Sequence, residues 1–201
     1  VDALTDLSVP SLSTSTAGIS NLRLGVNAGD ALTSGGNYNV VLGDEAGTAL
    51  TTGDNNVAVG FEALATEDGH GESTAIGYQT LKMQNAGASG LNVAVGYQAG
   101  AAVTTGVKNV IVGASAGDAL AAGANNTAVG YEALSTEDAH GNNTAIGYRA
   151  LKTLDAGAEG YNTAVGVDAG LSVSTGVKNT IMLAFAGDAL AAGANNVAIG
   201  Y

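Results

Sequence analysis

The chain has 201 residues, with 31 glycines, one proline, no cysteine, no tryptophan and a net charge of −12 that arises from 18 acidic and six basic residues. So few Lys and Arg side chains argue against nucleic-acid binding and against docking on anionic lipid, while the lack of cysteine excludes disulfides and thiolate metal sites. Hydrophobic residues make up 46% of the chain and are largely Ala and Val, whose small side chains predict a thin core. No run of residues is long and apolar enough to span a membrane.

Residues 1–20 form the first segment, a lead-in that precedes the repeats. From residue 21 onward the motif Asn-x-(small or apolar)-apolar-Gly recurs in one register, with Ser73 in place of one Asn. Successive starts are 17 residues apart, except for one spacing of 18 and two of 19. This period is too short for an ankyrin or tetratricopeptide unit and suits a solenoid coil. We therefore predict an all-β fold, a parallel β-solenoid of ~17-residue rungs, whose handedness the sequence leaves open.

Each rung is expected to begin with a short strand and to continue through turns. The alternating, β-branched segment Asn126–Tyr131 predicts a strand. Segments rich in Gly, Asn and Asp, such as residues 51–56 and 135–143, predict turns. The sequences "EAL" at residues 62–64 and "RAL" at residues 149–151 predict one helical turn after the strand in their rungs.

A longer repeat of 70 residues is superimposed on the rungs. Residues 56–125 and 126–195 are identical at 47 of 70 positions. We interpret them as duplicated blocks of four rungs within a solenoid shaft that covers residues 21–201. Because the chain begins at Val1 and ends within a repeat, we expect it to be a piece of a longer chain, truncated at both ends.

Two columns of the repeat suggest structural roles. Side-chain amides in stacked rungs can hydrogen-bond from rung to rung, so we interpret the Asn column as a ladder, with ligand binding as the alternative. The Gly four residues later predicts close backbone approach at the strand end. The ladder comprises Asn56, Asn92, Asn109, Asn126, Asn143, Asn162, Asn179 and Asn196.

The strands that follow Asn56 and Asn126 are uncharged on both faces. In the strand that follows Asn126, Thr127, Val129 and Tyr131 lie on one face, and Ala128 and Gly130 lie on the other. A strand with one solvent-exposed face should alternate apolar and polar residues. One coil has only one interior, so the second apolar face requires a partner, and we expect that partner to be another copy of the chain.

The repeated N-[TV]-A-[VI]-G-Y-x-A-L motif, over residues 21–201, resembles the repeats of phage tail fibres and other virion fibres. It also resembles the repeats in the β-roll heads of bacterial trimeric autotransporter adhesins, whose coil is shorter. The resemblance implies an intertwined or side-by-side homotrimer that serves as a structural fibre shaft in a virion and supports attachment to a host surface. Other virion proteins and host surface glycan are the further partners it implies. An adhesin head on an extracellular cell surface is the alternative.

The two histidines are the candidate metal ligands. The sequence "TEDGHG" contains Glu67, Asp68 and His70, and "TEDAHG" repeats them as Glu137, Asp138 and His140. Carboxylates beside imidazole can bind a divalent ion. The competing interpretation, a solvated polar turn copied by duplication, is the one that we adopt, and the sequence has no calcium-loop spacing. We therefore expect no metal and no cofactor.

We expect no enzymatic activity, because every acidic candidate lies in a repeated column and no nucleophile elbow occurs. A polysaccharide-cleaving solenoid, with paired carboxylates, is one minor alternative. Ice binding is another, because residues 127, 144, 163 and 180 form a partial Thr column. Val replaces Thr at residues 57, 93, 110 and 197, and we expect this row to be buried.

The two 19-residue spacings each add two residues between strands that keep their register. The extra length is expected to leave the stack as a loop. The candidate loops are residues 82–91 and 152–161, four rungs apart, which are Gly-rich and differ between the two blocks. Loops on a rigid scaffold are where contact surfaces vary most freely.

Overall fold

The computed structural model describes residues 18–137 and 139–200, so the lead-in predicted at residues 1–20 lies outside the described residues except for its last three. The described part is all-β, with eleven parallel strands of three residues in a single sheet, in the order of the sequence. The strands are β1 Leu22–Leu24, β2 Val40–Leu42, β3 Val57–Val59, β4 Thr74–Ile76, β5 Val93–Val95, β6 Val110–Val112, β7 Thr127–Val129, β8 Thr144–Ile146, β9 Thr163–Val165, β10 Thr180–Met182 and β11 Val197–Ile199.

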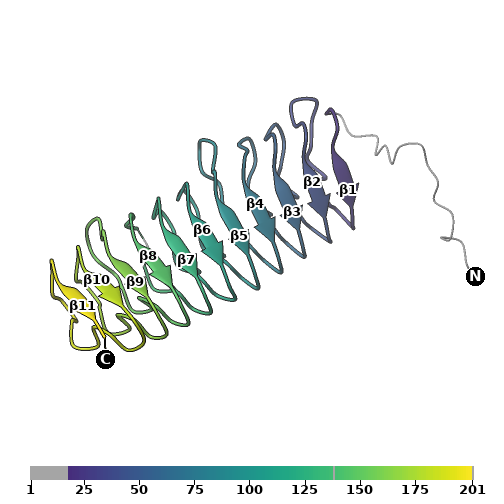
Figure 1. Cartoon of the computed structure of the whole chain (residues 1–201). Helices are drawn as coiled ribbons and strands as arrows, with labels where there is room; N and C mark the ends of the chain where they lie inside the picture. The colour runs from purple at the N-terminus through teal and green to yellow at the C-terminus, as the bar shows by residue number, and fades with distance from the viewer. Residues whose placement is uncertain (1–17, 138, 201) are drawn as a thin grey trace, which may run out of the picture.

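The chain winds as an elongated stack in which each rung pairs with the next. Figure 1 shows β1 and β11 at opposite ends of this stack. The pairing keeps each motif position in line, since Thr127 pairs with Thr144 and Val112 pairs with Val129. Backbone hydrogen bonds also join the rungs beyond the strands, as from the Gly113 N–H to the Val95 carbonyl at 2.8 Å. The predicted parallel β-solenoid of ~17-residue rungs is confirmed.

The glycine that ends each strand is required by both backbone conformation and space. Gly130 has a φ of +135°, and a Cβ there would lie 2.3 Å from the Gly147 carbonyl oxygen of the next rung. No side chain fits that distance, so glycine lets successive rungs approach closely. Leu183 is the one replacement in this column; it has a φ of +84° and an exposed side chain.

The core lies inside the coil and is built from small side chains. The middle residue of a strand, such as Ala128 or Ile111, is fully buried, and so is the Ala seven residues after each Asn, such as Ala116. Larger side chains fill the corner beyond it in two ways. In one kind of rung Leu120 packs over Gly117. In the other kind the position equivalent to Gly117 is itself a leucine, as at Leu134.

The predicted helical turns at "EAL" and "RAL" are wrong. Residues 62–64 and 149–151 form turns, and there is no helix among the described residues. Glu62 and Leu64 have φ values of +51° and +53°, and Leu151 has a φ of +48°. A right-handed helix requires negative φ at every residue. The positive φ values at these positions turn the chain around the corner of the coil instead.

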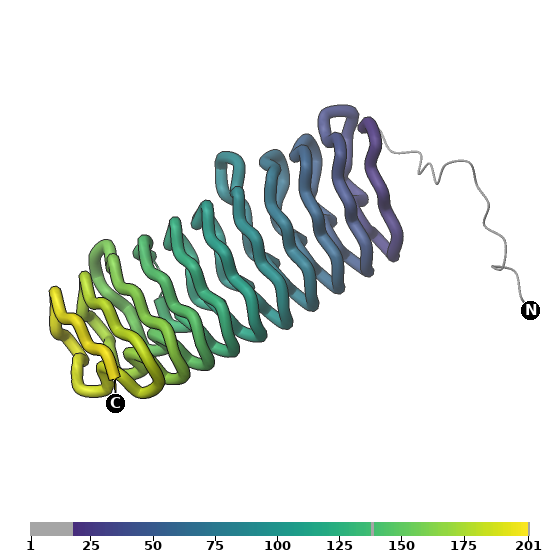
Figure 2. Tube along the Cα trace, in the orientation of Figure 1, coloured from purple at the N-terminus to yellow at the C-terminus, as the bar shows by residue number. Residues whose placement is uncertain are grey.

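The loops predicted at the two long rungs form, but they are shorter than expected. Figure 2 shows the loop before β5 projecting beyond the outline of the neighbouring rungs. Residues 87–89 and 157–159 are exposed, and a Cβ on Gly87 or Gly157 would meet nothing within 4 Å. Gln84 and Gly90, inside the predicted range, are buried, because they belong to the rung on either side of the loop.

Candidate functional site

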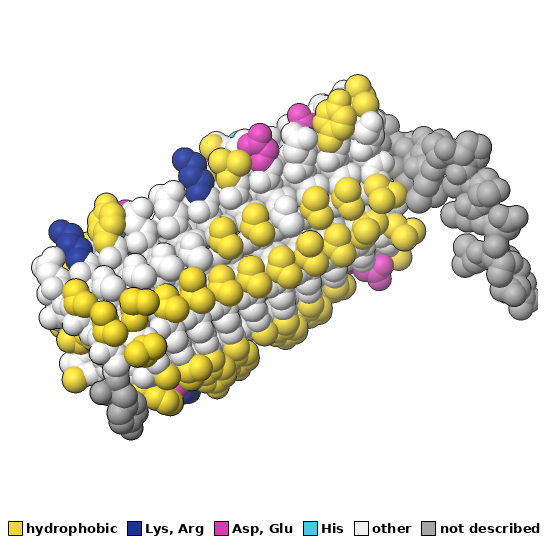
Figure 3. Space-filling model, in the orientation of Figure 1, with side chains coloured by type: hydrophobic (Ala, Val, Ile, Leu, Met, Phe, Trp, Pro, Cys, Tyr) yellow, Lys and Arg dark blue, Asp and Glu magenta, His cyan; other side chains and the backbone are white. Residues whose placement is uncertain are grey.

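The outward side of the sheet carries a continuous apolar row, which we name the strand-face stripe. It consists of the third residue of each strand from β2 to β11: Leu42, Val59, Ile76, Val95, Val112, Val129, Ile146, Val165, Met182 and Ile199. Ile76 and Ile146 are each 38% exposed. Figure 3 shows rows of hydrophobic side chains running the length of this face. Arg23 is the only charged residue in any of the eleven described strands.

The stripe is continuous because the sheet is parallel and in register. Side chains of neighbouring strands then align along the axis, so every rung adds one apolar residue to the same line. The first residue of each strand lies on the same outward side. The expectation that this Thr and Val row is buried is wrong for the single chain, since Thr163, Thr180 and Val110 are exposed. The inward face of these strands therefore packs in the core, whereas the outward face, with its uncharged Thr and Val row, is not covered within the single chain.

Aromatic rings form a second outward row just beyond the strands. Phe61, Tyr78 and Tyr97 stack in succession, with centroids 5.4 and 5.2 Å apart, and Tyr131 stacks on Tyr148 at 5.4 Å. These rings are 41–54% exposed. Sequence reasoning missed the stack, although the aromatic residues recur five positions after the Asn column and thus signalled it.

A polar ladder runs beside the aromatic row, and the two blocks build it differently. In the first block Gln79 donates to Glu62 at 2.6 Å, Gln98 donates to Gln79 at 3.0 Å, and Lys82 pairs with Glu62. These contacts hold the pKa of Glu62 below its ordinary value, chiefly through the Lys82 hydrogen bond.

The second block keeps the Lys–Glu ion pair and has a second ion pair where the first block has two glutamines. Arg149 makes a two-point contact with Asp168 at 2.7 and 2.8 Å, and Lys152 pairs with Glu132 at 2.5 Å. The hydrogen bond from Lys152 lowers the pKa of Glu132, and the hydrogen bond to Asp168 raises the pKa of Arg149. Sequence reasoning did not find this ladder either, because its partners are 17 to 20 residues apart.

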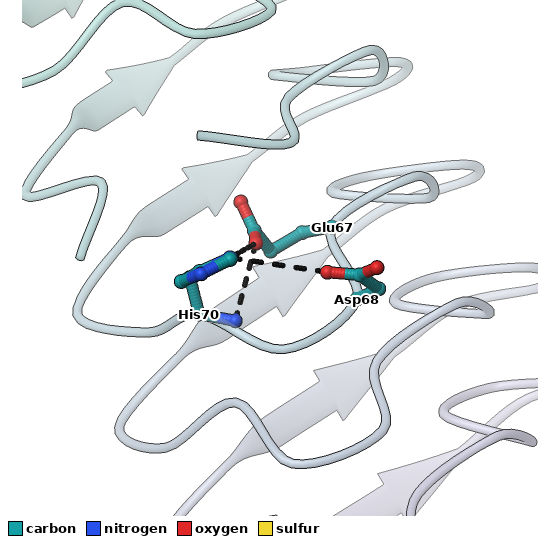
Figure 4. A group of neighbouring side chains, drawn as sticks. All are labelled: Glu67, Asp68 and His70. Atoms are coloured by element: carbon teal, nitrogen blue, oxygen red, sulfur yellow. Dashed lines mark hydrogen bonds and ion pairs between the residues drawn. The ribbon is translucent and has the colours of Figure 1, made fainter. Parts of the chain in front are cut away.

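The first candidate metal cluster is an anchored turn. Glu67 is fully buried, and its Oε1 accepts from the His70 backbone N–H at 3.3 Å and contacts His70 Nδ1 at 3.2 Å. Its Oε2 accepts from Gln84 Nε2 at 2.9 Å. Figure 4 shows the His70 ring beside the Glu67 carboxylate, with Asp68 reaching in from the other side.

The second cluster contains a residue that sequence reasoning did not name. Glu137 is again buried and bonded to the His140 backbone and ring at 3.1 Å, and the third residue of the group is Asp155, which supplies a second carboxylate. Asp138, the predicted third residue, lies outside the described residues. In each cluster three ligand atoms lie within 4.8 Å of one another, so among the residues that the structure describes these two groups could hold a cation.

The hydrogen bonds of the buried glutamates favour a structural role. In most rungs the corresponding position holds Leu or Val, as at Leu120 and Val103. Glu67 and Glu137 instead tie the turn that contains the histidine to the loop that follows, through Gln84 in one block and the Ala156 N–H in the other. A buried carboxylate is tolerated when its oxygens are hydrogen-bonded in this way.

The Asn column braces each rung against the next. The Asn126 backbone N–H donates to Oδ1 of Asn109 at 2.8 Å, and Nδ2 of Asn109 donates to the Gly123 carbonyl at 2.8 Å. The same pair of bonds recurs along the column, so the amides join backbone to backbone rather than only one another. Among the described residues, the Nδ2 of Asn143 is the one buried side-chain atom without a partner.

Residues 18–137 and 139–200 contain no helix long and apolar enough to cross a membrane. Comparison of the chain with protein-family models, with curated proteins and with solved structures gives no match. The fold and the surface of this chain are therefore the basis for a proposal about its function.

Proposed function

We propose that the chain is the shaft of a phage tail fibre, a structural rod of three identical copies that supports attachment to a host surface. The observation that carries this proposal is the strand-face stripe. An exposed, continuous apolar surface on a soluble protein marks an interaction site. Here the surface runs along the whole rod, so a partner that covers it must be equally long and equally repetitive.

A second copy of the same chain meets both requirements. Two copies that lie parallel and in register bring the same rungs to the same height, so apolar residues face apolar residues along the stripe. The charges that give the chain its net −12 lie mainly in the turns and ladders, away from this contact. The number of three copies rests on the resemblance to fibre repeats, as does the placement in a virion, with other virion proteins and host surface glycan as further partners.

Measurement of the mass in solution tests the assembly. We expect sedimentation equilibrium to give three times the chain mass of 19.4 kDa. Ile146→Asp places a charge within the stripe and should shift the protein toward monomer. Ala122→Asp, at an exposed turn position away from the strands, is the matched control and should leave the mass unchanged. A wild-type chain that stays monomeric at all concentrations would contradict the proposal.

The adhesin head remains the second candidate, because its repeats share the motif. Any flanking sequence would distinguish the two, since a tail-binding segment before these residues would fit the fibre and a membrane anchor after them would fit the adhesin. We propose no catalysis. Incubation with host polysaccharide should produce no new reducing ends, and their appearance would favour a polysaccharide-cleaving solenoid instead.

A further inference from the structure

We propose that the bond between Asp68 and Gly69 is a site of spontaneous covalent modification, at which the aspartate closes to a succinimide and reopens as isoaspartate. Asp68 is the only one of the eleven aspartates that is followed by glycine, and no asparagine in the chain is followed by glycine. Glycine lacks the Cβ that hinders attack by its backbone nitrogen on the preceding side chain. The chemistry is therefore concentrated at one position.

The folded geometry brings the reacting groups together. The Gly69 backbone N–H donates to Oδ1 of Asp68, so the nucleophilic nitrogen lies beside the carboxyl group that it attacks. The neighbouring carbonyl of Asp68 is held in place, since the backbone N–H and Oγ1 of Thr51 both donate to it, at 2.6 and 2.9 Å. Holding two reactive groups next to each other is a recognised source of rate acceleration.

Water has access to the site. The Asp68 side chain is 55% exposed. Gly69 and His70 line an open polar hollow of about 240 Å³, together with Asp54 and Ser89. Water can therefore leave after ring closure and return to open the ring.

The reaction requires only water. The Gly69 nitrogen forms a bond to Cγ of Asp68 and loses its proton, while the bond from Cγ to the hydroxyl oxygen of the protonated carboxyl breaks and water departs. Water then adds to one of the two ring carbonyls, and the bond from that carbon to the Gly69 nitrogen breaks as the nitrogen takes back a proton. Addition at Cγ restores aspartate, and addition at the main-chain carbonyl leaves the chain linked through Cγ as isoaspartate. The second product adds a methylene to the main chain and displaces the carbonyl that Thr51 contacts.

The duplicated block supplies a matched control. Asp138 is followed by Ala139 within the otherwise identical sequence "TED-x-HG". Gly69→Ala should fold normally, because Gly69 does not have positive φ. The added Cβ would lie 3.4 Å from Oγ1 of Thr52, an ordinary van der Waals contact. Ala139→Gly makes the reciprocal change in the second block.

Ageing of the intact chain in heavy-oxygen water, in a mildly acidic buffer below the unfolding temperature, tests the proposal. Peptide mapping should show heavy oxygen and isoaspartate at Asp68 accumulating roughly tenfold faster than at Asp138. An isoaspartate-specific methyltransferase should label the same peptide. Gly69→Ala should lower the rate at residue 68 by about the same factor, and Ala139→Gly should raise the rate at residue 138.

Two results would overturn the proposal. One is equal labelling of residues 68 and 138 in the wild-type chain. The other is a rate at Asp68 that is much lower in the folded chain than in the urea-unfolded chain, since that would mean that the fold protects the bond rather than positioning it. Circular dichroism of each variant before ageing establishes that the compared proteins are folded.

Discussion

Removal of one ladder amide should destabilise the solenoid by several kcal/mol. Asn109 is fully buried, its Oδ1 accepts the Asn126 backbone N–H, and its Nδ2 donates to the Gly123 carbonyl. Asn109→Ala leaves both backbone groups buried without partners. Each orphaned group costs about 1–3 kcal/mol, so we expect a loss of about 2–5 kcal/mol once the relief from burying the amide itself is counted.

The column contains its own comparison. The Nδ2 of Asn143 has no partner, and its Oδ1 accepts from the Asn162 N–H at 3.1 Å and from Asn162 Nδ2 at 3.3 Å. Asn162 Nδ2 also donates to the Gly176 carbonyl, so Asn143→Ala leaves only the Asn162 N–H without a partner and should cost about half as much as Asn109→Ala. Where Ser73 replaces Asn, Gln84 donates to the serine Oγ at 2.9 Å and accepts from Asn92 at 2.8 Å. An amide from elsewhere thus supplies part of what the missing asparagine would have supplied.

Urea unfolding followed by far-ultraviolet circular dichroism measures these losses. All variants must be compared at one protein concentration, because the stability of an oligomer depends on it. Asn85→Ala, at an exposed loop position, is the control and should lie within about 0.5 kcal/mol of wild type. If Asn109→Ala is as stable as Asn85→Ala, the ladder does not hold the rungs together and the reasoning fails.

Four further substitutions probe other parts of the solenoid. Gly130→Ala should lower the free energy of unfolding by about 3 kcal/mol or more, since it combines positive φ with contact against the next rung. Gly157→Ala, with a φ of +64° and open space around it, should lower it by about 1–2 kcal/mol. Equal losses in urea unfolding would show that contact between rungs is unimportant. Leu120→Ala empties a fully buried corner and should cost about 2–5 kcal/mol, and calorimetry that finds no drop in Tm would show that the corner refills. Glu132 has a lowered pKa, so it contributes stability above its ordinary value of 4.5 that is lost as the pH falls through its folded-state pKa. Lys152→Met should therefore flatten the decline of Tm with acid, and an unchanged profile would count against this ion pair.

The rung length, the strand positions and the parallel register could all be predicted from the sequence. Each depends on one local motif that returns at a nearly constant spacing, and a parallel stack of identical turns is the arrangement that satisfies every copy at once. The apolar character of both strand faces was also readable, because Thr127 and Val129 alternate with Ala128 along three residues. The loops at the long rungs followed from the two added residues, although their extent did not.

Only the tertiary structure determined what happens at the corners. The "EAL" turn resembles a helical turn in its composition, but positive φ at Glu62 and Leu64 directs the chain around the coil. Whether Glu67 faces solvent or core depends on that direction, and the structure buries it against Gln84 of the next rung. The ladder from Lys152 to Glu132 likewise joins residues 20 apart. Periodicity specifies which residues share a column, but contacts between columns depend on where each corner aims its side chain, and that is decided by the stacked coil as a whole.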